Sequence, residues 1–229
     1  MSSDLRLGPL LGSGRTADVY ALDDEADEAW VLRRYRDGYG DAPAEAAVME
    51  YVRGHGYPVP RVRPTHKRTD LMMERLSGPT MLQALADGLI GPRDAGATLA
   101  RLLRDLHALP PRVSTDPTAR VLHLDLHPDN VMLTPTGPRV IDWTNSEEGP
   151  PGLDWGISAV ILAQVAVGDD PLGEPAGALL AALLDGNERA ITEEGLAEAR
   201  RRRAANVTMT TREVEVLGDA EELIRGLLY

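Results

Sequence analysis

The first 76 residues alternate between short extended runs and polar turns. Five runs carry the apolar or alternating pattern of β-strands and are bounded by Gly, Pro, Asp or Thr. They are residues 7–11, 19–22, 30–35, 58–66 and 70–76. One segment, residues 42–56, instead has apolar residues at helical spacing and Gly54 or Gly56 as its end. The pattern predicts a sheet of about five strands with one helix inserted after the third.

The pattern becomes helical beyond residue 76. Residues 94–109 place four leucines on one helical face, which predicts a strongly amphipathic helix. A shorter helix is expected over 80–87, a small hairpin over 131–143, and mostly helix from residue 152 onward. The sequence therefore predicts an α+β protein, with a β-rich N-terminal lobe over 1–76 and a mainly helical C-terminal lobe over 77–229.

Composition narrows the functional classes. The chain has 229 residues, no cysteine and a net charge of −12, which excludes disulfides and disfavours nucleic acid as a partner. The acidic balance and the adjacent acids Glu147 and Glu148 mildly favour a cationic acceptor. No targeting segment is visible near the N-terminus, and the longest apolar run, residues 157–168, is too short to span a bilayer. We expect a cytoplasmic protein without a membrane partner, whose oligomeric state the sequence does not indicate.

A glycine-rich turn separates the first two predicted strands. Gly12, Ser13 and Gly14 could cover a phosphate chain with their backbone N–H groups. Val19, at the start of the next strand, would then face a nucleotide base. The alternative interpretation is an ordinary hairpin turn.

The third predicted strand carries a candidate phosphate-binding cation. Lys67 is the only lysine and lies on a later strand–turn–strand unit, so the strand cation must be an arginine. Arg33 has the appropriate spacing, and Glu45 on the following helix is its expected partner, with Glu50 as the alternative. A strand with two exposed arginines, Arg33 and Arg34, is an equally simple interpretation of this run alone.

Residues 123–130 read HLDLHPDN, which matches the catalytic-loop pattern of kinases. In that pattern Asp125 orients the attacking hydroxyl or accepts its proton, and Asn130 returns across the loop to bind Mg²⁺. Pro128 would stiffen the turn and His123 would tie the loop to the core. His127 is interpreted either as a packing residue or as a contact to substrate.

A second acid follows the predicted hairpin. Asp142 emerges from an apolar strand in Ile-Asp-Trp, where kinases carry an Mg²⁺-binding Asp. Asp154 precedes an apolar helix and is interpreted as its N-cap or as a brace for the catalytic-loop backbone.

These motifs, in this order, resemble the aminoglycoside phosphotransferase and choline kinase-like family of the protein-kinase-like fold. The resemblance covers about residues 12–163 and rests on GSGRTADVY, AEAAVMEYVRGHGYPVPRV, LMMERLSGPTM, LARLLRDLHAL, HLDLHPDNVML and VIDW. It implies two lobes with ATP in the cleft between them and adenine contacts from Met73, Glu74 and Leu76. It also implies that Asp125 is the catalytic base and that Asn130 and Asp142 bind Mg²⁺.

Two positions depart from the family pattern. Leu124 stands where the family usually has Gly, and Arg33 replaces Lys. Thr144 replaces the Gly of Asp-Phe-Gly, as is common in this family. The resemblance implies an ATP- or GTP-dependent phosphotransferase acting on a hydroxyl of a small molecule, such as an aminoglycoside-like or other cationic compound, with a role in antibiotic resistance as one form of this activity. Two alternatives remain open: a non-catalytic nucleotide-binding module of the same fold, and a peptide or protein kinase.

Overall fold

The computed structural model describes residues 6–14, 16–22, 29–36, 40–63, 65–169, 171–207 and 209–228. The chain divides into two compact units. Unit 1 contains Met1–Gly78 and Thr134–Thr144, and unit 2 contains Pro79–Leu133 and Asn145–Tyr229. The expected lobes, 1–76 and 77–229, put residues 134–144 in the second lobe, whereas these residues group with unit 1 in the structure. The nucleotide-binding and catalytic roles of the lobes stay predictions.

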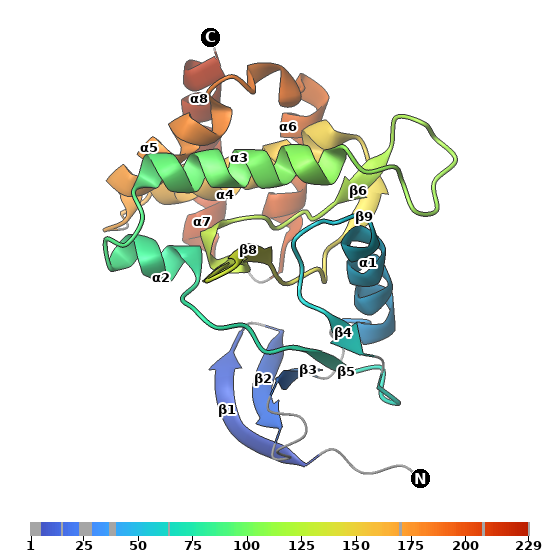
Figure 1. Cartoon of the computed structure of the whole chain (residues 1–229). Helices are drawn as coiled ribbons and strands as arrows, with labels where there is room; N and C mark the ends of the chain where they lie inside the picture. The colour runs from blue at the N-terminus through green and yellow to red at the C-terminus, as the bar shows by residue number, and fades with distance from the viewer. Residues whose placement is uncertain are drawn as a thin grey trace. The chain divides into compact units, whose positions relative to one another are not determined.

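Unit 1 is built on an antiparallel sheet of five strands in the order β1-β2-β3-β5-β4 (Figure 1). The strands are β1 (Leu7–Ser13), β2 (Ala17–Leu22), β3 (Trp30–Tyr35), β4 (Val62–Arg63) and β5 (Asp70–Glu74). Helix α1 (Ala42–Gly54) follows the third strand. The predicted α+β class and the five-stranded sheet with one helix are confirmed.

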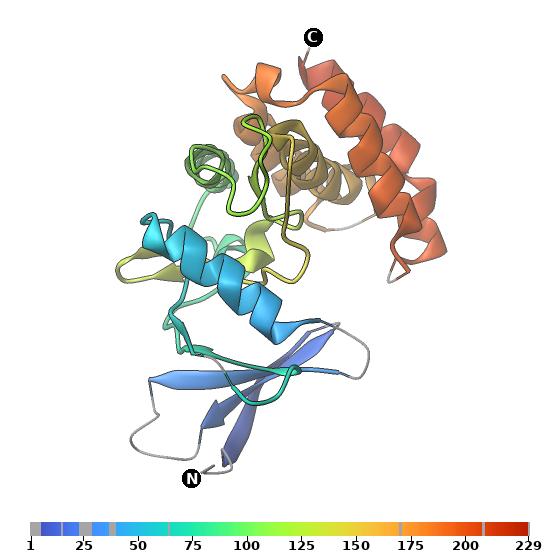
Figure 2. The same ribbon diagram turned by 90° about the vertical axis from the view of Figure 1, so that its right-hand side faces the viewer.

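The helix of unit 1 begins and packs as its sequence dictates. The Asp41 side chain accepts a hydrogen bond from the N–H of Ala44 and caps the helix, and a proline lies in the first turn. The helix buries Met49 and Val52 completely and lies against the strands β4 and β5 (Figure 2). Leu32 and Trp30 belong to a small apolar cluster formed by residues of the sheet.

The expected hairpin consists of β7 (Val131–Thr134) and β8 (Gly137–Val140). The end of β8 and the segment after it are anchored within unit 1. The Val140 N–H donates to the Pro58 carbonyl at 2.8 Å, and the Tyr57 ring meets the Trp143 ring edge-on at 5.7 Å. These contacts hold Asp142 close to the strand and helix that carry Arg33 and Glu45.

Unit 2 is mainly helical, as predicted. Its helices are α2 (Met81–Ala86), α3 (Pro92–His107), α4 (Pro151–Val167), α5 (Gly173–Leu184), α6 (Glu193–Ala205), α7 (Thr211–Glu215) and α8 (Leu217–Leu228). The amphipathic α3 packs on α5, while the apolar α4 packs against α5, α6 and α8. A Cβ at Gly96 would lie 2.3 Å from the Leu179 carbonyl oxygen, so glycine permits the close approach of α3 and α5. Within the described residues, no helix is both long and apolar enough to cross a membrane.

One element of unit 2 was not predicted. Strands β6 (Arg120–Leu122) and β9 (Glu147–Gly149) form a two-stranded antiparallel ladder in which Leu122 pairs with Glu147. Short 3₁₀ turns cover Pro128–Asn130 and Glu188–Ala190. The ladder fixes the start of residues 123–130, because β6 ends directly before His123.

Candidate functional site

Arg33 lies at the centre of a buried polar network in unit 1. Its side chain extends from β3 and is only 6% exposed. One guanidinium nitrogen donates to Glu45 Oε1 at 2.6 Å, and another donates to Asp142 Oδ1 at 2.6 Å. Burial alone would lower the pKa of Arg33, but the carboxylates of Glu45 and Asp142 outweigh burial and raise it. The exposed-strand interpretation of Arg33 is therefore wrong.

Arg34 points away from this network, as expected for its neighbour on a strand. It pairs with Asp70 at 2.6 Å. Of the two candidate helix acids, Glu45 is the partner of Arg33, and Glu50 is exposed. The Glu45 carboxylate also accepts the N–H of Trp143 at 3.0 Å. Burial raises the pKa of Glu45, although Arg33 opposes this shift.

The turn after β8 presents Asp142 in an unusual backbone conformation. Its φ of 64° lies in the left-handed region, which non-glycine residues rarely adopt. The Thr144 hydroxyl donates to Asp142 Oδ1 at 2.7 Å and accepts from Arg33 at 3.1 Å. The Tyr35 hydroxyl contacts Thr144 at 2.9 Å and donates to Glu45. Sequence analysis missed Tyr35, whose only signal was its place two residues after Arg33, on the same strand face.

The glycine-rich turn lies between β1 and β2. Gly12 is paired with Val19, and Ser13 with Asp18. The Gly14 N–H donates to the Ala17 carbonyl at 2.9 Å, which closes the turn. A Cβ on Gly12 would meet no atom of the described residues within 4 Å, so their packing does not require glycine there. Open space above the backbone at Gly12 is compatible with close approach of a ligand.

The residues expected to contact adenine lie along or just after β5. Met73 is buried and pairs with Val31 across the sheet. Glu74 accepts the N–H of Arg61 at 3.1 Å and donates its own N–H to the Arg61 carbonyl at 2.8 Å. Leu76, two residues beyond the strand end, is half-buried. Their contact with a nucleotide stays a prediction.

In unit 2, Asp154 holds the first residues of the catalytic-loop motif by their backbone. Its carboxylate accepts the N–H of His123 at 2.9 Å and the N–H of Leu124 at 2.7 Å. His107 Nε2 lies 2.9 Å from the same carboxylate. Burial would raise the pKa of Asp154, but the hydrogen bonds from His107 and the His123 backbone lower it overall. The N-cap interpretation is wrong, because Pro150 occupies the cap position; Asp154 braces the loop.

Leu124, the first departure from the family pattern, also has a left-handed backbone, with φ of 60°. This conformation explains why glycine suits the position. The bond from its N–H to Asp154 and the burial of its side chain, which is 9% exposed, hold the leucine in place.

The middle of the loop brings Asp125, His127 and Asn130 together. Asn130 Nδ2 donates to the Asp125 carbonyl at 2.8 Å and lies 3.3 Å from Asp125 Oδ2. His127 Nε2 lies 3.8 Å from Asp125 Oδ1 and 3.2 Å from Asn130 Nδ2. Burial lowers the pKa of His127, partly opposed by Asp125 and Asp129. All bonds that the structure shows for Asn130 use its nitrogen, which leaves the amide oxygen to serve as a cation ligand.

The two acids after the Asp142 segment have partners within unit 2. Glu147 pairs with Arg202 at 2.8 Å. Glu148 accepts three backbone N–H groups from Arg112, Val113 and Ser114, which lowers its pKa despite the opposing effect of burial. Neither carboxylate therefore supports the expected preference for a cationic acceptor.

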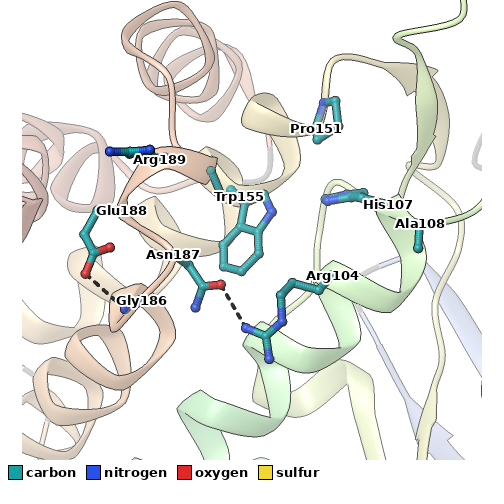
Figure 3. Close-up of a pocket in the computed structure, with 10 residues that line it drawn as sticks. Arg104, His107, Ala108, Pro151, Trp155, Gly186, Asn187, Glu188 and Arg189 are labelled. Carbon is teal, nitrogen blue, oxygen red and sulfur yellow. Dashed lines mark hydrogen bonds between the residues drawn. The ribbon is translucent and has the colours of Figure 1, made fainter.

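A hollow of about 520 Å³ lies elsewhere on unit 2, between α3, the start of α4 and residues 186–190. Figure 3 shows Trp155 between His107 and Asn187, with Arg104 donating to Asn187 at 2.8 Å. None of the expected site residues lines this hollow. His107, which lines the hollow, contacts Asp154, the acid that holds the catalytic-loop backbone.

The sequence matches a known protein family over most of its length. The model of the APH phosphotransferase enzyme family matches residues 8–119 and 91–202. The chain belongs to this family. The matched region of this phosphotransferase contains the glycine-rich turn, Arg33, the catalytic-loop motif and Asp142, and the predicted family resemblance is confirmed. No curated protein matches the chain.

Solved structures show the same fold at low sequence identity. An amicoumacin kinase in complex with AMP-PNP, Ca²⁺ and Ami has a TM-score of 0.55 and 13% identity, covering 97% of this chain and 90% of that one. A Plasmodium vivax ethanolamine kinase gives 0.58 and 12%, covering 97% and 74%. The ADP-bound aminoglycoside phosphotransferase APH(2'')-Ib gives 0.51 and 13%, covering 99% and 94%. The predicted kinase-like fold is confirmed.

Proposed function

We propose that this phosphotransferase is a small-molecule kinase that transfers the γ-phosphoryl group of ATP or GTP to a hydroxyl group. The observation that carries the proposal is the position of Arg33, a buried strand cation bound both to Glu45 of α1 and to Asp142. Kinases use a strand cation and a helix acid in this way to hold nucleotide phosphates.

The donor atoms fit Mg²⁺. The Asn130 amide oxygen and the Asp142 carboxylate are hard oxygen ligands, the type that Mg²⁺ prefers. Bound Mg²⁺ would neutralise charge on the nucleotide phosphates. Arg33 would add a fixed positive charge, and Asp125 would orient the acceptor hydroxyl or take its proton. The open space at Gly12 supports a place for the phosphates.

The acceptor is a small hydroxylated compound in this proposal. Proteins with the same fold include an ethanolamine kinase and an aminoglycoside phosphotransferase, which supports amino alcohols and aminoglycosides as the first compounds to test. The partners of Glu147 and Glu148 remove one reason for restricting the search to cations. The screen should therefore include neutral and anionic hydroxylated compounds as well.

The test is a coupled assay of nucleoside diphosphate release over such a panel, with ATP and GTP each supplied with Mg²⁺. Titration of ATP into the protein accompanies the screen. We expect Mg²⁺-dependent ATP binding and stimulation of turnover by one class of acceptor. Folded protein that binds neither nucleotide would contradict the proposal.

One observation favours a second candidate, a nucleotide-binding module without catalysis. Both terminal guanidinium nitrogens of Arg33 are used on protein groups, namely Glu45, Asp142 and Thr144. Arginine at this position could therefore fix the structure rather than contact phosphate. Mg²⁺-dependent ATP binding without turnover on any acceptor, peptides included, would favour this candidate.

A further inference from the structure

Thr144 makes three polar contacts around the proposed metal ligand. Its hydroxyl donates to Asp142 Oδ1 at 2.7 Å, accepts from Arg33 at 3.1 Å and lies 2.9 Å from the Tyr35 hydroxyl. All of these groups belong to unit 1. A side chain without a hydroxyl could reproduce none of the three contacts.

Tyr35 belongs to the same network and extends from β3. The residue is 2% exposed, and its hydroxyl donates to Glu45, the acid that also holds Arg33. The contacts form a closed ring that runs from Arg33 to Glu45, Tyr35, Thr144 and Asp142 and back to Arg33. Burial, followed by the effect of Glu45, raises the pKa of Tyr35, so the phenol stays protonated as a donor.

The ring of contacts restrains the side chain of Asp142, whose backbone conformation is unusual. Asp142 is in the left-handed region, and its side chain is 35% exposed. The bonds from Arg33 and Thr144 both end on Oδ1. Two donors on one oxygen fix the plane and direction of the carboxylate, and thereby the direction of the other oxygen.

We propose that Thr144 is a positioning residue that orients the Asp142 carboxylate toward a divalent cation, and that Tyr35 stabilises this arrangement through Glu45, the acid that holds Arg33. The inference rests on the proposed function, because it assigns Asp142 to the metal. Partners behind a metal ligand typically change metal affinity by about 10- to 100-fold when they are removed. Thr144 therefore acts on the metal through Asp142 and not by contact with the nucleotide.

The experiment compares Thr144→Val, which keeps the shape and removes the hydroxyl, with Thr144→Ser, which keeps the hydroxyl. ATP affinity is measured by calorimetry with Mg²⁺ and with EDTA, after circular dichroism has established folding. We expect Thr144→Val to reduce the gain in ATP affinity from Mg²⁺ about tenfold. Affinity in EDTA should change less than about twofold, and Thr144→Ser should retain most of the gain.

Tyr35→Phe provides a second, independent variant. It should weaken the Mg²⁺-dependent gain in the same direction, by about threefold, because Glu45, which holds Arg33, loses the donor from Tyr35. If Thr144→Val does not fold, Tyr35→Phe decides the question, and an unchanged Mg²⁺-dependent gain overturns the proposal.

Three other outcomes are distinguishable. Equal loss in Thr144→Val and Thr144→Ser, or equal loss with Mg²⁺ and with EDTA, means a merely structural role and overturns the positioning inference. An unchanged Mg²⁺-dependent gain in Thr144→Val also overturns it. Wild-type protein that binds no ATP under either condition contradicts the proposed function itself.

Discussion

Two turns carry Asp125 and Asp142, and different contacts hold each turn in place. Each contains a non-glycine residue in the left-handed region, Leu124 in unit 2 and Asp142 in unit 1. In unit 2 the buried Asp154 holds the backbone N–H of Leu124, while the polar contacts of Asp125 among the described residues lie within its own loop. In unit 1 the carboxylate of Asp142 is held directly by Arg33 and Thr144.

The difference suits the roles proposed for the two acids. An acid that orients the hydroxyl of a phosphate acceptor needs a fixed backbone and a side chain that can reach the bound substrate. A metal ligand benefits from a side chain oriented in advance by its neighbours. We therefore expect the stability of unit 1 to depend on the ion network around Arg33. We expect the stability of unit 2 to depend on Asp154, the buried side chain that accepts backbone N–H groups.

Loss of the strand cation should have the largest effect on stability. Arg33→Met leaves Glu45, which is 3% exposed, without its cation, and we expect a loss of about 3–5 kcal/mol in the free energy of unfolding. Urea denaturation measures this loss. Arg36→Met, which breaks the exposed pair with Asp18, is the control and should have a much smaller effect. Equal effects of the two substitutions would contradict the central role of Arg33 in the stability of unit 1.

Asp154→Ala tests the other half of the comparison. The substitution leaves the N–H groups of His123 and Leu124 buried without an acceptor, and about 3 kcal/mol should be lost. Denaturant unfolding followed by tryptophan fluorescence measures the change. Asp105→Ala, at an exposed position of α3, is the matched control and should change little. A stability like that of the wild type would show that the loop does not need this acceptor.

The energetic cost of the left-handed conformation of Leu124 can be measured by comparing two truncations at the same position. Leu124→Gly should be more stable than Leu124→Ala by about 1 kcal/mol, because both lose the side chain but only glycine tolerates this backbone freely. The same pair at Leu102, inside α3, should give the opposite order by a similar amount. The same order at both positions would contradict the backbone explanation.

The smallest expected effect is on the dependence of stability on pH. The pKa of Asp154 lies below the ordinary value of 3.8 in the folded protein, so the unfolded state binds protons more readily in acid. The contribution of Asp154 is therefore complete above 3.8 and is lost as the pH falls below that value. Unfolding of the wild type and of Asp154→Asn between pH 7 and about pH 3 should show a shallower slope for the variant. Parallel slopes would count against this linkage.

The contacts that sequence analysis predicted follow regular spacing. Arg33 was assigned from its place on a strand, and Glu45 from its place in the first turn of the next helix. Such positions repeat with the period of the element, so their partners can be inferred before the fold is known. The five-stranded sheet with its inserted helix was predictable for the same reason.

The missed contacts depend on features without a period. Tyr35 and Thr144 are 109 residues apart in sequence and meet through the turn after β8, in which Asp142 has a left-handed backbone. The ladder of β6 and β9 has three residues in each strand, which is too few for an alternating pattern to be recognised. Asp154 was ambiguous because an acid near a helix start usually caps that helix.

The most direct test of the central claim is phosphoryl transfer by two variants of the same loop. Asp125→Asn and Asp129→Asn each remove one charge within residues 123–130, but only Asp125 is assigned to the acceptor. Transfer of labelled phosphate from ATP, to the acceptor found in the screen or otherwise to water, should fall at least about 100-fold in Asp125→Asn and stay near the wild-type rate in Asp129→Asn. Equal rates for the two variants would contradict the account.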